Sequence, residues 1–275
     1  MDRLSDLLAR FSVRAGVFHS GAFCGITAFD GDQQEGQLHL LRAGQMAVLL
    51  DGQEARVAEP SLLFLPRPYR HRLMAGDADQ TELVCASLNF DGGAGNPLAA
   101  ALPDYLLLPL DTVPMLEPTL RWLFEEAFGE ECGRLAMMNR LFELLVIQLL
   151  RHLLATRGVE SGMLAGLADP RLARALNQLH AHPEASWTLD SMAEAAAMSR
   201  ARFAAHFRAV VGQTPGDYLL SWRLGLAQKL LREGMAMQRV AEQVGYESAS
   251  ALARAFRRKT GNSPREWRKA ERAAG

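Results

Sequence analysis

Residues 199–218, S-R-A-R-F-A-A-H-F-R-A-V-V-G-Q-T-P-G-D-Y, recur 49 positions later as residues 248–267, S-A-S-A-L-A-R-A-F-R-R-K-T-G-N-S-P-R-E-W. The alignment has no gap and places Phe207 on Phe256 and Gly212 on Gly261. Each copy predicts a helix that ends at a glycine, followed by a helix that begins at a proline. A chain that builds one arginine-bearing helix twice is suited to a long, periodic partner, and duplex DNA is the obvious candidate.

Each copy also carries the signals of a helix-turn-helix unit. In the first copy Thr188 is expected to cap a supporting helix and Ser199 a second helix that buries Phe203, Phe207 and Val210. In the second copy Ser248 is expected to cap the equivalent helix. In a helix-turn-helix unit the second helix enters the major groove of DNA.

The outward faces of these two helices supply the candidate DNA contacts. They are Arg200, Ala201, Arg202, Ala204, Ala205 and Arg208 in the first copy, and Ser248, Ser250, Ala253, Arg254 and Arg257 in the second. Arginine binds phosphates or a guanine edge, and alanine permits close approach to a thymine methyl group. Arg254 is the best candidate for a base contact, since it is the one long donor in mid-helix among small neighbours. The alternative is a helical bundle without a DNA role, its charges merely solvated.

The connection between the copies, residues 215–231, predicts one long helix with surface positions at Arg223 and Lys229. Such a helix would fix the separation of the two groove-entering helices, which we call the readers. For successive major grooves on one face of DNA this separation must be about 34 Å.

Charge is segregated along the chain. From Arg171 onward there are 17 Lys+Arg and 9 Asp+Glu, a net charge of +8; residues 1–170 hold the remaining 13 and 22, a net charge of −9. A basic C-terminal part indicates a polyanionic partner. No apolar run reaches the roughly 18 residues that span a bilayer, so no membrane partner is expected. The start of the chain does not resemble a signal peptide, and the 3 cysteines are an odd number. We therefore expect a cytoplasmic protein with reduced thiols.

The N-terminal part predicts strands and then helices. Short apolar runs at 38–41, 46–50, 55–58 and 62–65 are separated by turn residues, and Asp51-Gly52 is typical of a hairpin. The fold class is α+β: a sensor barrel at 1–112, a helical segment at 113–157, a linker at 158–169 and an all-helical domain at 170–275. The helix expected at 135–154 is apolar nearly all round, so it is packed against the barrel or forms a homodimer seam.

The C-terminal third resembles the AraC/XylS family of bacterial transcription regulators. The resemblance rests on W-T-L-D-S-M-A-E-A-A-A-M-S-R-A-R-F-A-A-H-F-R and on V-A-E-Q-V-G-Y-E-S-A-S-A-L-A-R-A-F-R-R-K-T-G-N-S-P-R-E-W-R. It implies seven helices, with two helix-turn-helix units in adjacent major grooves of double-stranded DNA. It also implies an activator that acts through RNA polymerase. At matching positions, the family's base contacts fall on Ala201, Ala204, Ala205, Ser250, Ala253 and Arg254. The first reader lacks long polar side chains there, so Arg200 and Arg202 are expected to compensate through phosphates.

The N-terminal part is similar to cupins, which implies a small jelly-roll barrel. F-L-P-R-P-Y-R-H-R-L carries His71, and L-H-L-L-R-A-G-Q carries His39, with Gln45 near the usual carboxylate position. A cupin metal site needs about three histidines and a carboxylate. The chain supplies His39 and His71, and zinc there would need a further ligand, His19 or a cysteine. We expect no cofactor, with zinc as the alternative. We also expect no enzyme, the rival being a metal-dependent cupin enzyme fused to a DNA-binding domain.

Two cysteines suggest a signal. Cys24 lies in F-C-G and Cys85 in L-V-C-A-S-L-N-F, and both are similar in position to cysteines of a family subgroup that responds to reactive chlorine species by thiol oxidation. The resemblance implies redox sensing at Cys24 and Cys85. The alternatives are that both pack as small apolar residues and that a small organic effector binds in the barrel. A bridge would require Cα atoms within about 7 Å.

Overall fold

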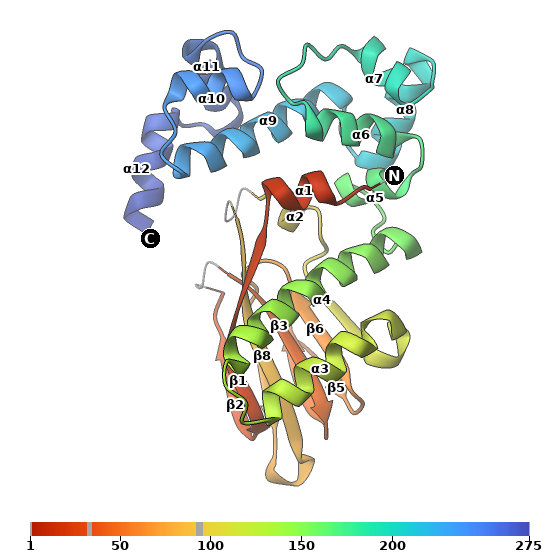
Figure 1. Cartoon of the computed structure of the whole chain (residues 1–275), viewed down its shortest axis with the longest axis vertical. Helices are drawn as coiled ribbons and strands as arrows, with labels where there is room; N and C mark the ends of the chain where they lie inside the picture. Colours follow the sequence, from red (N-terminus) through yellow and green to blue (C-terminus); the bar gives the residue numbers. More distant parts are fainter. Residues whose placement is uncertain (1, 32–34, 92–95, 275) are drawn as a thin grey trace. The chain divides into compact units, whose positions relative to one another are not determined.

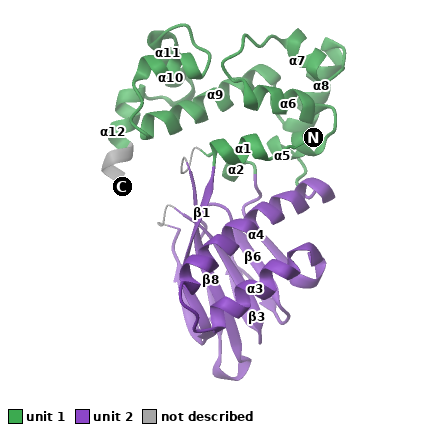
Figure 2. Ribbon diagram, in the orientation of Figure 1, with its two compact units in different colours: residues 1–11, 95–101, 159–275 green, residues 12–94, 102–158 purple. Residues whose placement is uncertain are grey.

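The computed structural model describes residues 2–31, 35–91 and 96–274 (Figure 1). The chain divides into two compact units (Figure 2), one made of residues 1–11, 95–101 and 159–275 and the other of residues 12–94 and 102–158. The α+β fold class is confirmed. No helix of the described residues has the length and apolar character that a membrane span requires.

The first unit is helical. Its elements are α1 (Ser5–Arg10), α2 (Pro97–Ala100), α5 (Met163–Ala168), α6 (Leu172–Ala181), α7 (Leu189–Ala195), α8 (Arg200–Val211), α9 (Pro215–Arg232), α10 (Met237–Gln243), α11 (Ala249–Thr260) and α12 (Pro264–Ala274). The pairs α7–α8 and α10–α11 are the two expected helix-turn-helix units, and α9 connects them. Thr214 caps α9 by accepting from the amide of Asp217, and Pro215 occupies its first turn.

The second unit contains nine strands among the described residues. They are β1 (Val13–Phe23), β2 (Gly25–Phe29), β3 (Gly36–Ala43), β4 (Met46–Leu50), β5 (Gln53–Val57), β6 (Ser61–Leu65), β7 (His71–Ala75), β8 (Thr81–Phe90) and β9 (Leu106–Pro109). One sheet has the order β1-β8-β3-β6-β9 and the other the order β2-β7-β4-β5. All paired strands are antiparallel.

The hairpin expected at Asp51-Gly52 is present between β4 and β5. Both residues have positive φ, 49° and 78°, as a two-residue type I′ turn requires. This turn fixes the register so that Met46, Val48 and Leu50 on β4 all point to one face and are buried.

Two helices complete the second unit after the short 3-10 turns η3 (Leu110–Thr112) and η4 (Pro114–Leu116). They are α3 (Glu117–Phe128) and α4 (Arg134–Thr156), as the apolar pattern predicts. Helix α4 runs along the edge strand β1 (Figure 1), where Asn139 accepts from the amide of Val17 at 2.9 Å and Glu143 from that of Ala15 at 3.3 Å. These contacts satisfy backbone donors that an edge strand leaves open.

Two expectations about segment boundaries differ from the structure. The stretch expected as a linker contains α5, whose six residues are all buried. A side chain at Gly166 would lie 2.7 Å from Leu176 on α6, so α5 packs too closely for a flexible connection. At the other end of the chain, residues 1–11 group with the helical unit rather than with the barrel.

Candidate functional site

The first helix-turn-helix unit is held by its buried face. Thr188 caps α7 by accepting from the amide of Ser191 at 3.1 Å. Ser199 occupies the N-cap of α8, but its side chain makes no capping hydrogen bond there. Phe203 and Phe207 are buried as expected. The third buried residue is Val211, one position beyond the expected Val210, because a helix returns to the same face after about four residues.

The outward face of α8 exposes five of its six predicted contact residues, with Ala204 half-buried; the exposed five are Arg200, Ala201, Arg202, Ala205 and Arg208. Arg200 is also paired with Asp190 on α7 at 3.3 Å. The pair lies on the surface and is weak, so Arg200 remains able to exchange its carboxylate for a phosphate.

The second unit repeats this arrangement with a complete cap. Ser248 accepts from the amide of Ala251 at 3.2 Å, and Leu252 and Phe256 are fully buried. The turn requires Gly245, whose φ is +77° and whose position leaves no room for a side chain, since a Cβ would lie 2.8 Å from the backbone carbonyl oxygen of Glu184. Both the backbone conformation and the lack of space therefore explain why glycine occupies this position.

The outward face of α11 presents its predicted contact residues to solvent. Arg254, Arg257 and Ser250 are exposed, and Ser248 and Ala253 are half-buried. Among the described residues neither Arg254 nor Arg257 forms a salt bridge. In each helix-turn-helix unit the predicted contact residues thus lie together on the second helix or at its N-cap, where a polyanion can reach the arginines.

Helix α9 connects the two helix-turn-helix units. The expectation that its Arg223 lies at the surface is wrong. Arg223 is half-buried and donates to the carbonyls of Pro183 at 2.7 Å and Ala185 at 2.8 Å. Burial lowers its pKa from the usual value. Its guanidinium also lies 5.8 Å from the ring centre of Tyr246 in the second unit's turn. One side chain thereby links the segment before α7 to the turn between α10 and α11.

The first residues of the chain pack against the same scaffold, which sequence analysis missed. Phe11 is fully buried with its ring centre 5.3 Å from that of Trp222 on α9. Arg10 donates to the carbonyl of Ala181 at 2.8 Å, and Lys229 donates to the carbonyl of Arg10. The available signal was the helical spacing of Leu4, Leu7 and Phe11, all of which are buried.

The two cupin-type histidines meet inside the barrel. His39 on β3 and His71 on β7 approach with their Nε2 atoms 2.9 Å apart. Nδ1 of His71 lies 2.8 Å from the carbonyl of Tyr69, to which it donates, so Nε2 of His71 is the acceptor and Nε2 of His39 the donor. Burial lowers the pKa of both residues, that of His39 most strongly. The pair is a neutral hydrogen-bonded one.

The fit of this pair to a metal is incomplete. The hydrogen bond uses the proton of His39 Nε2 that a metal would have to replace, and Gln37, 3.2 Å from His39, contributes only an amide oxygen. Gln45 instead bonds to Asp79 and Arg56. No group of three His, Cys, Asp or Glu side chains in the described part of the chain is arranged to hold a metal ion. Zinc at His39 and His71 stays a prediction with two ligands.

The two candidate redox cysteines lie in different environments. Cys85 on β8 is buried opposite both His19 and His39, and burial raises the pKa of its thiol. Cys24 is exposed after β1 and donates to Asp77 at 2.8 Å, a bond that raises the pKa of its thiol. Along β1, His19 pairs with Cys85, whereas Phe23, next to Cys24, pairs with Thr81. Four residues of strand separate the two rows, about 13 Å. A Cys24–Cys85 bridge therefore requires rearrangement.

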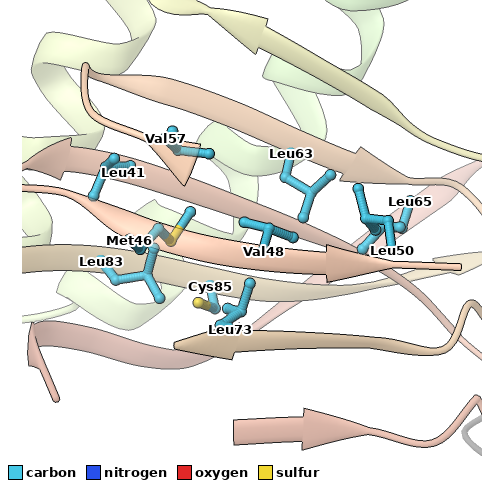
Figure 3. Close-up of a cluster of buried hydrophobic side chains, with 10 residues drawn as sticks. All are labelled: Leu41, Met46, Val48, Leu50, Val57, Leu63, Leu65, Leu73, Leu83 and Cys85. Atoms are coloured by element: carbon cyan, nitrogen blue, oxygen red, sulfur yellow. The ribbon is translucent and has the colours of Figure 1, made fainter. Parts of the chain in front are cut away.

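The barrel interior is filled by side chains. Figure 3 shows ten buried residues packed between the two sheets: Leu41, Met46, Val48, Leu50, Val57, Leu63, Leu65, Leu73, Leu83 and Cys85. Beside His71 a small cavity measures about 10 Å³, the space of one water molecule.

Comparisons with known proteins follow the same division of the chain. A family model described as a cupin matches residues 2–155, and one described as a helix-turn-helix domain matches residues 192–270. The chain is 37% identical over 245 residues to a putative AraC-like transcription regulator of Streptomyces lividans, covering 86% of this chain and 79% of the relative.

Two further proteins are similar. The RCS-specific HTH-type transcriptional activator RclR of Escherichia coli is 30% identical over 235 residues, covering 84% of this chain and 83% of the relative. The solved DNA-binding domain of AdpA, a global transcriptional factor in complex with a target DNA, is 34% identical; it covers 38% of this chain and 95% of its own, with a TM-score of 0.36.

Proposed function

The chain belongs to the AraC-like transcription regulators, and from this premise we propose that it binds operator DNA as a homodimer and activates transcription through RNA polymerase. Double-stranded DNA is the partner of such regulators. The observation that carries the proposal is the pair of helix-turn-helix units, each with an exposed basic outer helix, mounted on α9. The barrel is assigned a regulatory rather than a catalytic role because the named relatives are regulators.

For DNA reading, we assign base contacts mainly to α11 and phosphate contacts mainly to α8. Arg254 is exposed, has no salt-bridge partner among the described residues and is flanked by the small residues Ser250 and Ala253, and these features support a contact of its guanidinium with a guanine edge. Helix α8 offers alanines at the matching positions, and its long donors Arg200 and Arg202 lie near the helix start. Phosphates are the natural targets of donors so placed.

The test uses an operator obtained by mapping the protein on chromatin. We expect each protomer to protect two sites about 10–10.5 base pairs apart on one face of the duplex. Removal of one phosphate-binding side chain, as in Arg202→Ala, should lower the slope of log affinity against log salt by about one. A single protected site, or binding that ignores sequence, would contradict the assignment.

For dimerisation, we propose the outward stripe of α4. Leu150 is fully buried within the unit, so internal packing accounts for part of the apolar excess of this helix. Leu144 is 40% exposed, with the half-buried Met137 and Ile147 two turns and one turn away on the same face. A second copy would cover this stripe. Sedimentation should show a dimer for the native chain and a monomer for Leu144→Glu. The control is Leu135→Glu, the same change at a leucine that is 54% exposed on the opposite side of α4.

We assign the sensing of the signal to the N-terminal unit. The two candidate signals are thiol oxidation and the binding of an organic ligand. The name of the Escherichia coli relative favours thiol oxidation, for which Cys24 is the accessible starting thiol. The second chemistry is an organic ligand. A reporter assay with hypochlorite separates them: loss of response in Cys24→Ser and in Cys85→Ser supports a thiol switch, and a normal response in both excludes it. Metal analysis and a turnover screen on the same protein test the rival enzyme hypothesis.

A further inference from the structure

A large cavity lies outside the barrel interior, along one face of α3. Its volume is about 800 Å³, and it is lined by Arg42, Leu110, Asp111, Pro114, Glu117, Leu120, Arg121, Phe124, Glu125, Phe128 and Gly129. Cavities of about 300–1,000 Å³ accommodate drug-sized molecules. All of these residues belong to the unit that contains the barrel, and none lies on α4, so the cavity is separate from the proposed dimer stripe.

The walls are apolar and aromatic. Phe124 and Phe128 are half-buried one helical turn apart on α3, and Leu120 continues the same face toward the start of the helix. Leu110 and Pro114, from η3 and η4, form the facing wall. Such a surface binds an aromatic or aliphatic body by removing it from water.

The charges of the cavity favour a cation. The lining holds two arginines and three carboxylates, a net charge of −1. Arg42 is already paired with Glu82 at 3.3 Å, and Arg121 lies 3.8 Å from Glu117. Asp111 and Glu125 are the carboxylates left over. Within the described residues they form no ion pair and no side-chain hydrogen bond.

One contact inside the cavity places a cation of the chain itself on the aromatic wall. The Arg42 guanidinium lies 4.3 Å from the centre of the Phe128 ring, the geometry of a cation–π interaction. The aromatic wall therefore already holds an organic cation supplied by the chain itself. Phe124, one turn away, adds a second ring to the lining, to which Asp111 and Glu125 also belong.

We propose that this cavity binds a small lipophilic monocation, with its apolar body against Phe124 and Phe128 and its charge near Asp111 and Glu125. The proposal rests on the proposed function, for which it names the organic signal and places it at α3 instead of in the filled barrel interior. Because α3 and α4 pack together, a ligand at α3 lies next to the helix that carries the proposed dimer stripe.

The test is calorimetric titration of the full-length protein with two ions of one shape, tetraphenylphosphonium and tetraphenylborate. We expect the cation to bind with one site per chain and the anion to bind at least tenfold more weakly. Asp111→Asn and Glu125→Gln should each weaken cation binding at least threefold and together at least tenfold. Glu59→Gln, an exposed acid outside the cavity, is the matched control and should leave the affinity unchanged.

Equal affinity for the two ions, absence of cation binding, or an unchanged cation affinity in the double variant would overturn the proposal. Operator binding is measured on the same preparations without either ion. A protein that binds its operator but not the cation refutes the cavity assignment alone, and a protein that binds the cation but no specific DNA refutes the proposed function alone.

Discussion

In α8, Arg200 forms a weak surface pair with Asp190 at 3.3 Å, and His206 lies 2.8 Å from Asp169, so two side chains of the first reader already have carboxylate partners. In α11, Arg254 and Arg257 are exposed and form no salt bridge with any described residue. Both helices bury two large side chains at the same spacing and end at a glycine with φ of 79°. Duplication therefore preserved the packing of the reader while the surfaces diverged, and we locate sequence reading mainly in the second copy.

The shared core gives the largest expected effect. Phe207 and Phe256 are both fully buried, so Phe207→Ala and Phe256→Ala should each lower the free energy of unfolding by about 3–5 kcal/mol. Urea denaturation of the full chain measures this, with Phe→Leu at each position as a milder control. A cost that is large in one copy and negligible in the other would break the equivalence of the two cores.

The divergent surfaces give the next effect. Arg254→Ala should weaken specific binding by about 1–3 kcal/mol and relax the preference at one base pair. The matched change Arg200→Ala should weaken specific and nonspecific binding alike. Fluorescence anisotropy with operator and scrambled duplexes separates these outcomes. Equal losses of specificity for the two variants would remove the distinction between the readers.

Acid should destabilise the packing of the first helix-turn-helix unit against α6 and α9. His180 on α6 bonds to Tyr218 at 2.6 Å, Tyr218 contacts Phe207, and burial lowers the pKa of His180 to about 3. Between about pH 6.5 and 3 the unfolded chain binds a proton at this residue that the folded chain does not, so stability falls as pH falls. From pH 7 to 5 the loss is about 2 kcal/mol.

This is tested by measuring the free energy of unfolding at pH 7 and pH 5 for the native protein and for His180→Gln. The variant should show a pH dependence smaller by that amount, whatever its stability at pH 7. An unchanged pH dependence would show that His180 titrates normally. Residues 237–274 contain no histidine, so the second copy has no such group.

The smallest effect concerns the helix caps. Ser248 accepts from Ala251, whereas Ser199 makes no capping bond. Ser248→Ala should cost about 1 kcal/mol, and Ser199→Ala less than about 0.5 kcal/mol. Equal costs, measured by thermal unfolding, would show that Ser199 caps α8 in solution.

The sequence predicted the readers well because their signals are local. Helix period, capping residues and the stops at Gly212 and Gly261 each act within a few residues, and the departures there are Val211 for Val210 and the absence of a capping hydrogen bond from Ser199. The hairpin at Asp51-Gly52 was predictable for the same reason.

Features that depend on distant residues were missed. Nothing local shows that α5 packs against α6, that Arg223 bonds across 40 positions to Pro183, or that Phe11 meets Trp222. The separation of Cys24 from Cys85 depends on the pairing of β1 with β8, which neither motif encodes.

The most direct test of the assignment of sequence reading to α11 is the affinity for an operator in which one of the two major-groove segments bound by each protomer is scrambled at a time. It is measured with native protein and with Arg254→Ala. We predict that the segment contacted by α11 contributes at least tenfold more to affinity than the segment contacted by α8, and that Arg254→Ala removes most of this excess. Equal contributions from the two segments, or an excess that survives Arg254→Ala, would contradict the assignment.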